Sequence, residues 1–224
     1  MRLPIPLLAA ALALGACQNS AQAAENIKHA PAASIVIDEG KGLQTAIFAG
    51  GCFWGVEGVF SHMKGVKSAI AGYHGGSRAN ASYRAVSSGK TAHAEAVKVT
   101  YDPAVVRYDQ LLRVFFSVIA DPTLKDRQGP DVGSQYRAAL IPLGADQRRV
   151  ATAYLKQMER SGIWSRPIVT RIEAPRTFYK AESSHQDFMR LNPNNPYIRR
   201  WDRPKVDALH RLYPDLYQTR FVRD

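Results

Sequence analysis

The stretch TAIFAGGCFWGVEGVFSHM, residues 45–63, combines a strand, a tight turn and a helix. Its first part is a short apolar run that ends at two glycines, which is typical of a buried strand. Helical spacing follows, with apolar side chains at Phe53, Val56, Phe60 and Met63. Cys52 stands at the junction of the turn and the predicted helix.

Strand and helix patterns alternate beyond this stretch. Strands are predicted at 66–76, 93–103, 134–143 and 167–175, and helices at 108–119 and 145–159. The order begins β-α-β-β-α-β, which predicts an α+β sandwich. The chain after Phe178 is rich in proline and asparagine. We therefore expect an irregular C-terminal extension with only short helical pieces.

The N-terminus has the features of an export signal. Arg2 is followed by an uncharged run that ends in LGAC, residues 14–17. LGAC resembles a bacterial lipobox, whose cysteine is lipidated and becomes the new N-terminus, so Cys17 is a candidate lipidation site. The sequence AQA at 21–23 offers the alternative of simple cleavage after Ala23. We predict a signal peptide at 1–17, a flexible tether at 18–41 and one folded domain at 42–224.

Export limits the thiol chemistry that is available. We expect the protein on the periplasmic face of a bacterial membrane as a lipoprotein or, after cleavage at Ala23, free in the periplasm. The sequence contains two cysteines. Cys17 is either blocked by lipid or removed with the signal, so Cys52 is the one thiol that remains and no intramolecular disulfide can form.

The chain carries a formal net charge of +11, and the excess lies late, with 16 Lys and Arg against 8 Asp and Glu in residues 148–224. A nucleic-acid interface would need a recognised motif or basic residues interleaved with aromatics, and neither is present, so we expect no nucleic-acid partner. The basic surface fits either anionic lipid headgroups or ordinary solvation. No sequence window approaches the roughly 18–20 apolar residues of a membrane span.

Cys52 and Glu95 are the candidate reactive groups. A helix N-terminus favours an anion and can lower a thiol pKa, which would make Cys52 a nucleophile, although a free cysteine is also a common buried filler. Glu95 shares a predicted strand face with Val97 and Val99. If that face is buried, the carboxyl group must be paired, hydrogen-bonded or protonated, and a pKa raised by desolvation would let it act as a proton donor near neutral pH. Alternatively, Glu95 reaches solvent at the strand end.

Other chemistries lack their motifs. SGKT at 88–91 has Arg84 where a phosphate loop needs its first glycine. The histidines have no paired metal spacing, so we predict no metal site. A Cys–His hydrolase would need a base such as His93 or His185, but no hydrolase signature surrounds Cys52.

GCFWGVE at 51–57 closely resembles the signature of the A-type peptide methionine sulfoxide reductases. Later blocks resemble that family in the same order: HAEAVKVTYDP, FFSVIADPT, RQGPDVGSQYRA, AESSHQDF and NPNNPYI. The resemblance covers roughly residues 45–200. It implies a ferredoxin-like α/β sandwich and reduction of the S epimer of methionine sulfoxide, free or in proteins, with no bound cofactor. Repair of exported proteins under oxidative stress is the implied role.

The resemblance also implies a role for each site residue. Cys52 attacks the sulfoxide sulfur and becomes a sulfenic acid, while Phe53 and Trp54 hold the S-methyl group. Glu95 protonates the sulfoxide oxygen. Tyr83 and Tyr136 add hydrogen bonds to that oxygen, and Asp131 orders the site or its water.

The sequence departs from the family pattern in three places. No resolving cysteine follows Cys52, so the sulfenic acid needs a thioredoxin-like, glutaredoxin-like or small-molecule thiol as external reductant. Ala120 replaces a histidine, and Ser184 precedes His185 where tyrosine is usual. Oxidised protein or free methionine sulfoxide is the expected substrate of a monomeric enzyme. A thiol-bearing binding module and a basic structural lipoprotein are the alternatives.

Overall fold

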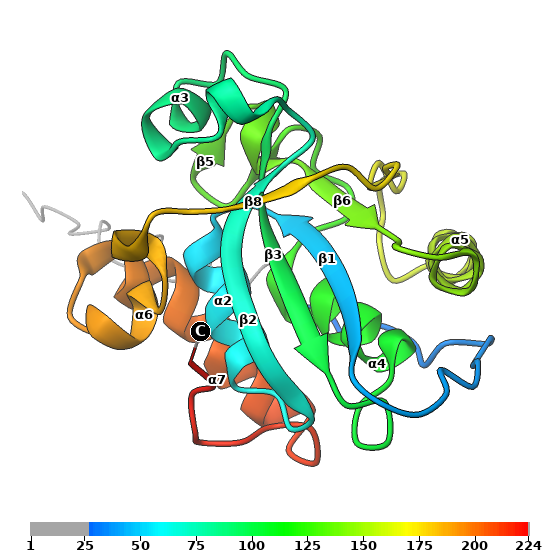
Figure 1. The fold of residues 1–224 in the computed structure, drawn as a ribbon. Helices are drawn as coiled ribbons and strands as arrows, with labels where there is room; N and C mark the ends of the chain where they lie inside the picture. The colour runs from blue at the N-terminus through cyan, green and yellow to red at the C-terminus, as the bar shows by residue number, and fades with distance from the viewer. Residues whose placement is uncertain (1–26, 224) are drawn as a thin grey trace, which may run out of the picture.

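The computed structural model describes residues 27–223. The predicted signal peptide, the Cys17 lipidation site, the cleavage point after Ala23 and the start of the tether lie outside these residues. A six-stranded sheet with the order β7-β6-β1-β3-β2-β8 forms the centre of the fold (Figure 1). Among residues 27–223, no helix is long and apolar enough to cross a membrane.

The predicted β-α-β-β-α-β core is present. It comprises β1 (Gln44–Gly50), α2 (Phe53–Ser61), β2 (Val66–His74), β3 (Ala94–Tyr101), α4 (Tyr108–Val114) and β6 (Ala138–Ile141). The π-helical turn Phe115–Ile119 continues α4. Strand β1 lies between β3 and β6 and is antiparallel to both, and β2 is antiparallel to β3. This is the ferredoxin-like order, and the α+β prediction is confirmed.

Both core helices cover one face of the sheet. Phe48 on β1 packs against Phe60 of α2, with ring centroids 4.9 Å apart, and against Phe115 after α4, at 5.4 Å. The other face of β1 carries Ile47 and Ala49, which join a small, mostly alanine cluster under Phe178. Successive side chains of β1 point to opposite faces of the sheet, so one face contacts a large aromatic core and the other a small cluster of mostly alanine residues.

The remaining elements extend this core. They are α3 (Tyr83–Ser87), β4 (Arg127–Gln128), β5 (Asp131–Val132), the 3₁₀ turn Ser134–Tyr136, α5 (Ala145–Arg160), β7 (Arg171–Ile172), β8 (Phe178–Lys180), α6 (Phe188–Leu191) and α7 (Arg203–Leu212). Two predicted strands are much shorter than expected. The strand predicted at 134–143 begins only at Ala138, because the 3₁₀ turn occupies its start, and the one predicted at 167–175 pairs only at β7.

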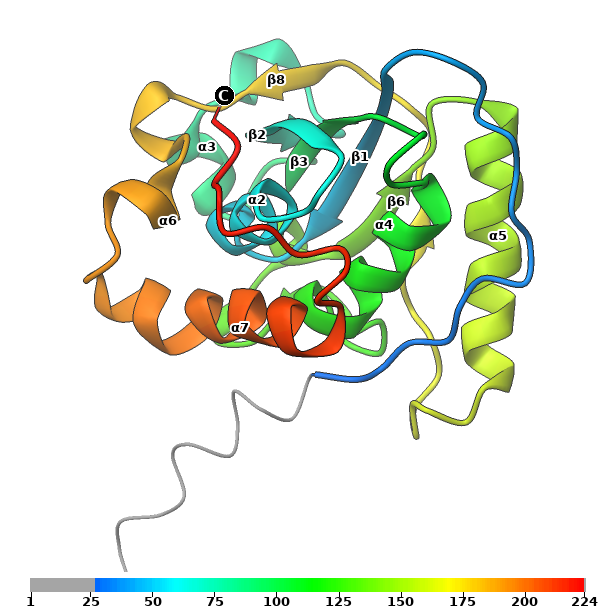
Figure 2. The same cartoon turned by 90° about the horizontal axis from the view of Figure 1, so that it is seen from below.

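The expectation of short helical pieces at the C-terminus is wrong. Residues Ile198–Asp202 form a π-helical turn that leads directly into α7. Pro204 lies in the first turn of α7, where no backbone N–H is required, so it does not break the helix. Val206 and Leu209 bury the inner face, and the helix lies across the end of α2 (Figure 2).

Candidate active site

Two glycines place Cys52 at the start of α2. Gly51 has φ +89°, a left-handed conformation that favours glycine, and a Cβ there would lie 2.6 Å from Cβ of Gln128. A Cβ on Gly50 would lie 2.6 Å from the Phe115 ring. The turn can therefore pass between the core and the β4–β5 hairpin only without side chains. It leaves Cys52 as the N-cap residue of α2, a free thiol that is 8% exposed.

Glu95 lies beside this helix end. It is the second residue of β3, it is 1% exposed, and its Oε2 accepts the backbone N–H of Phe53 at 2.9 Å. Burial raises the pKa of Glu95 to about 8, against the opposing effect of the Phe53 N–H, and the charges of Asp131 and Asp202 raise it further. The carboxyl group is therefore protonated at neutral pH, and the alternative that it reaches solvent is excluded.

The acidity of Cys52 differs from the sequence-based expectation. Burial raises the pKa of Cys52 well above its usual value, and the negative charges of Glu95 and Asp202 raise it further. The backbone N–H of Trp54 lowers it, as expected at a helix N-terminus, but this effect is smaller. The expectation of a lowered pKa is wrong because desolvation of the thiolate outweighs the helix end.

Tyr83, Tyr136 and Asp131 approach from three separate segments. Burial and then the charge of Glu95 raise the pKa of both tyrosines, and Cys52 contributes to each, so the two phenols lie within electrostatic range of Cys52 and Glu95. Asp131 on β5 accepts a hydrogen bond from the hydroxyl of Tyr197. The fold thus brings together five residues from α2, α3, β3, β5 and the 3₁₀ turn.

Phe53 and Trp54 occupy different environments. Phe53 is 0% exposed, and its ring lies 5.9 Å from Tyr73 and 6.3 Å from Tyr83, centroid to centroid. Trp54 is half-buried and stacks on Phe188 of α6, with centroids 3.7 Å apart. The two rings therefore form the inner and the outer part of one aromatic cluster at the start of α2.

His185 and Glu182 hold this cluster in place through hydrogen bonds and ring stacking, a role that the sequence did not identify. His185 Nδ1 accepts the indole N–H of Trp54 at 3.2 Å, and its ring stacks on Tyr83 at 4.0 Å. Glu182 accepts the hydroxyl of Tyr73 at 2.7 Å and the backbone N–H of Tyr83 at 2.9 Å. The block AESSHQDF was visible in the sequence, but only the fold shows which rings it contacts.

Both candidate bases for a hydrolase make hydrogen bonds to groups other than Cys52. Both ring nitrogens of buried His93 are engaged, Nδ1 with the backbone N–H of Gly76 at 3.2 Å and Nε2 with the carbonyl of Ser77 at 2.9 Å. His185 is engaged with Trp54. Within residues 27–223, no group of three or more His, Cys, Asp or Glu side chains is placed to hold a metal ion.

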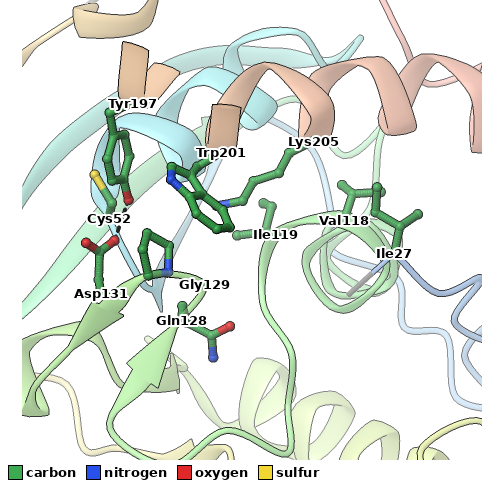
Figure 3. A pocket seen from close by; sticks show the side chains of 11 residues that line it. Ile27, Cys52, Val118, Ile119, Gln128, Gly129, Asp131, Tyr197, Trp201 and Lys205 are labelled. Carbon is green, nitrogen blue, oxygen red and sulfur yellow. Dashed lines mark hydrogen bonds between the residues drawn. The ribbon is translucent and has the colours of Figure 1, made fainter. Parts of the chain in front are cut away.

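A cavity opens beside Cys52, and the C-terminal helical segment forms one wall of it (Figure 3). It is lined by Ile27, Cys52, Val118, Ile119, Gln128, Gly129, Pro130, Asp131, Tyr197, Trp201 and Lys205. Cys52 and Asp131 are the predicted site residues among these. Phe53, Trp54, Tyr83, Glu95 and Tyr136 lie outside the lining, and Trp54 meets its wall through an edge-on contact with Tyr197. The cavity therefore combines a thiol with an acidic and a basic side chain.

The sequence and the fold match one family. A family model described as peptide methionine sulfoxide reductase matches residues 44–215. The chain is 51% identical over 181 residues to peptide methionine sulfoxide reductase MsrA 2 of Mesorhizobium japonicum, which covers 81% of this chain and 93% of that protein. It is 46% identical over 175 residues to MsrA 2 of Synechocystis sp., covering 78% and 82%.

Solved structures agree with these sequence matches. Mxr1 of Saccharomyces cerevisiae in its reduced form has a TM-score of 0.60 at 32% identity, over 72% of this chain and 92% of that one. Methionine sulfoxide reductase A of Corynebacterium diphtheriae has a TM-score of 0.58 at 29% identity, over 76% and 90%. The chain therefore belongs to the A-type peptide methionine sulfoxide reductase family, whose members are oxidoreductases that reduce methionine sulfoxide.

Proposed function

We propose that this protein reduces the S epimer of methionine sulfoxide, free or in exported proteins, by direct attack of Cys52 on the sulfoxide sulfur. The observation that carries the proposal is the contact between the protonated Glu95 carboxyl group and the start of α2, beside the thiol. A sulfoxide is a poor electrophile until its oxygen is protonated, so a neutral acid in a dry site is the group the reaction needs.

The proton and electron balance is simple. Glu95 donates its proton to the sulfoxide oxygen, and the sulfur of Cys52 attacks the activated sulfur and gives up its own proton, which returns Glu95 to the acid form. The attack forms a bond between the two sulfur atoms, and the oxygen leaves the methionine sulfur as water with the proton that Glu95 received from Cys52. Water then attacks the Cys52 sulfur and returns a proton to Glu95. The bond between the sulfurs breaks with its electron pair passing to methionine, and Cys52 is left as a sulfenic acid. Methionine leaves, and no other reactant is consumed in this half of the cycle.

The raised pKa of Cys52 is compatible with this scheme. A buried thiol that stays protonated in the resting site is protected from adventitious oxidants. Transfer of its proton to Glu95, once that residue has donated its own, produces the nucleophile only when a sulfoxide is present. In this scheme Tyr83 and Tyr136, whose raised pKa values keep their hydroxyls protonated, act as hydrogen-bond donors to the sulfoxide oxygen.

We assign substrate contacts from the surroundings of the thiol. Trp54, held by Phe188 and His185, is the outer wall for the S-methyl group, and Phe53 forms the base beneath it. Asp131, with Tyr197, faces the cavity where the rest of the methionine residue must lie. An aromatic wall with a few convergent polar groups is the usual form of such a pocket.

The second half of the cycle requires two thiols from outside the domain. The first condenses with the Cys52 sulfenic acid, releases water and forms a mixed disulfide. The second displaces Cys52 and restores its thiol. A thioredoxin-like or glutaredoxin-like protein, or a small thiol, fits this chemistry. Because no cysteine follows Cys52 in the sequence, peptide mapping of the oxidised enzyme without reductant should find no disulfide within residues 42–224.

The decisive experiment is a single turnover without reductant. Purified protein is mixed separately with the S and R epimers of a blocked methionine sulfoxide, and both the methionine released and the mass of the Cys52 peptide are measured. About one equivalent per enzyme from the S epimer alone, with one oxygen on Cys52, is expected. Release by a Cys52→Ser variant, or no release by folded, reduced wild type, would contradict the proposal.

Export and anchoring form a separate part of the proposal. The lipobox-like LGAC and the basic first residues support a lipoprotein on the periplasmic face, where oxidised exported proteins would be repaired. Mass spectrometry of the mature N-terminus tests this. A diacylglyceryl mass on Cys17 is expected, whereas an unmodified N-terminus at Ala24 would show simple signal cleavage.

A further inference from the structure

Asp202 is a fully buried carboxylate that lies against the catalytic helix. It is the last residue of the π-helical turn before α7 and is 0% exposed. A Cβ on Gly55, in the first turn of α2, would lie 2.2 Å from Oδ1 of Asp202. Glycine inside a helix costs about 1 kcal/mol relative to alanine, so a glycine here needs a packing reason. The carboxylate of Asp202 is that reason.

Neighbouring groups neutralise the charge of the Asp202 carboxylate only in part. Lys205, one turn along α7, places Nζ 3.3 Å from Oδ1 of Asp202 and also lines the cavity. The other oxygen, Oδ2, is buried and has no hydrogen-bond partner. A charge removed from water in this way acts on its neighbours through a weakly screening medium.

The titratable groups that interact electrostatically with this charge come from several elements. They are Lys205 on α7, Tyr197 before the π-helical turn, Asp131 on β5, Cys52 at the start of α2 and Glu95 on β3. Of these, Lys205 is the only cation. The carboxylate therefore makes the electrostatic potential around the thiol and Glu95 more negative.

We propose that Asp202 is a positioning residue of the reductase, whose buried carboxylate, held by Lys205 against Gly55, keeps Cys52 and Glu95 in their protonated forms until a sulfoxide is present. The inference rests on the proposed mechanism, in which both protons are needed. It also gives the carboxylate a role in the chemical step. Protonation of the sulfoxide oxygen places positive charge on sulfur, and a nearby buried anion stabilises that charge.

The electrostatic effects have the required sign. The charge of Asp202 contributes to the raised pKa of both Cys52 and Glu95, after burial in each case. The first turn of α2 acts in the opposite direction, because the N–H groups of Phe53 and Trp54 favour the ionised forms. Asp202 thus opposes the effect of the helix N-terminus on the pKa values of Cys52 and Glu95.

The pH dependence distinguishes this role from packing. Burial raises the pKa of Asp202 to about 6, although Lys205 opposes the shift. Its charge is therefore present at pH 8 and largely absent at pH 5. Replacing Asp202 with asparagine should change the acidity of Cys52 at pH 8 and leave it nearly unchanged at pH 5, whereas a loss of packing would act at both.

The test measures the rate at which methyl methanethiosulfonate, a small thiol reagent, modifies Cys52 between pH 5 and pH 11, a range that includes the raised midpoint of the thiol. It compares the full-length wild type, D202N and the control D207N. Asp207 lies on the same helix and pairs with Arg203 at 3.3 Å on the surface. In D202N the midpoint should move to lower pH and the rate at pH 8 should rise about threefold, the equivalent of half a pKa unit. The rate at pH 5 should match wild type, and D207N should match it throughout.

Reduction of the S epimer by D202N should change in the opposite direction to the modification of Cys52. Because Glu95 loses its proton at lower pH in D202N, methionine release at pH 8 should fall while thiol modification rises, and release at pH 6 should be closer to wild type. An unchanged midpoint in D202N, or one constant factor at all pH values, would overturn the inference. Asp202→Ala repeats the measurement if asparagine lowers the melting temperature.

Failure of the inference and failure of the proposed function are separable. Modification of Cys52 does not require turnover, so the midpoints report on Asp202 even if the enzyme releases no methionine. Conversely, a wild type that reduces the S epimer with a Cys52 midpoint independent of Asp202 would support the proposed function alone.

Discussion

The backbone N–H of Phe53 donates a 2.9 Å hydrogen bond to the buried carboxyl group of Glu95. This bond joins the first residue of α2 to β3 and places a proton donor next to the nucleophile, which precedes Phe53 in the chain. Burial of Glu95 has an energetic cost, because the ionised form of its carboxyl group is poorly solvated at this site.

Glu95→Gln should lower kcat/KM for the S epimer by roughly 10²–10⁴-fold, the usual contribution of a general acid. The glutamine carbonyl can still accept the Phe53 N–H, but its amide has no acidic proton to transfer to the sulfoxide oxygen. Wild-type activity should fall as pH rises through about 8, where Glu95 ionises, and the residual activity of the variant should lack that fall. Single-turnover methionine release from pH 6 to pH 10 measures both. Glu159→Gln on the exposed side of α5 is the matched control, and equal losses in the two variants would contradict the assignment.

The same substitution should stabilise the protein at high pH. The pKa of Glu95 is raised in the folded state, so folding retains a proton that the unfolded chain loses above about pH 4.5. Its contribution to stability is therefore greatest below that pH and is lost as pH rises to about 8. The unfolding free energy of Glu95→Gln relative to wild type should rise by about 3 kcal/mol between pH 5 and pH 8. Urea denaturation at the two pH values tests this, and a constant difference would refute it.

Substitution of His185 should loosen Trp54. Phenylalanine at 185 keeps a ring against Tyr83 but removes the acceptor of the indole N–H, and a hydrogen bond of this kind contributes about 0.5–1.5 kcal/mol. We expect kcat/KM to fall about two- to tenfold in His185→Phe, and further in His185→Ala, which also loses the stacking. Exposed His210→Ala is the control.

The pH dependence of this effect follows from the acidity of His185. Burial lowers the pKa of His185 below its ordinary value of 6.5, so the ring is a neutral acceptor at pH 7 and is protonated only under acidic conditions. Wild type should therefore lose its advantage over His185→Phe at acidic pH. An advantage that stays constant as pH is lowered until the ring of His185 is protonated would show that the hydrogen bond is not responsible.

Gly51→Ala should both destabilise the protein and misplace Cys52. Gly42 has a similar φ, +92°, and a Cβ added there would have no atom within 4 Å, so Gly42→Ala carries the backbone strain alone. Gly51→Ala adds a clash with Gln128. Its excess loss of unfolding free energy should be about 1–3 kcal/mol, the usual cost of overpacking, accompanied by slower single-turnover reduction. If thermal unfolding shows the same loss of stability in Gly51→Ala and Gly42→Ala, the β4–β5 hairpin shifts to accommodate the added Cβ and the prediction is wrong.

Much of the fold and the centre of the site could be predicted from local patterns. Apolar runs that end in glycines and alternate with helical stripes encode the β-α-β-β-α-β core, because these periodicities report which face each segment buries. Glu95 was identified in the same way, as a carboxylate on an apolar strand face. The C-terminal helix was missed because Pro204 resembles a helix breaker until its position in the first turn is known.

The sequence by itself determined the elements, the position of Cys52 at a helix start and the family to which the chain belongs, since these depend on local spacing and on ordered blocks of residues. Only the tertiary structure decided the acidity of the site. Burial raises the pKa of Cys52 by more than the helix N-terminus lowers it. Asp202, which is 147 residues from Gly55 in the sequence, lies next to Gly55 in the fold. Desolvation and charge proximity depend on the distance between atoms in space, and no local pattern in the sequence records that distance.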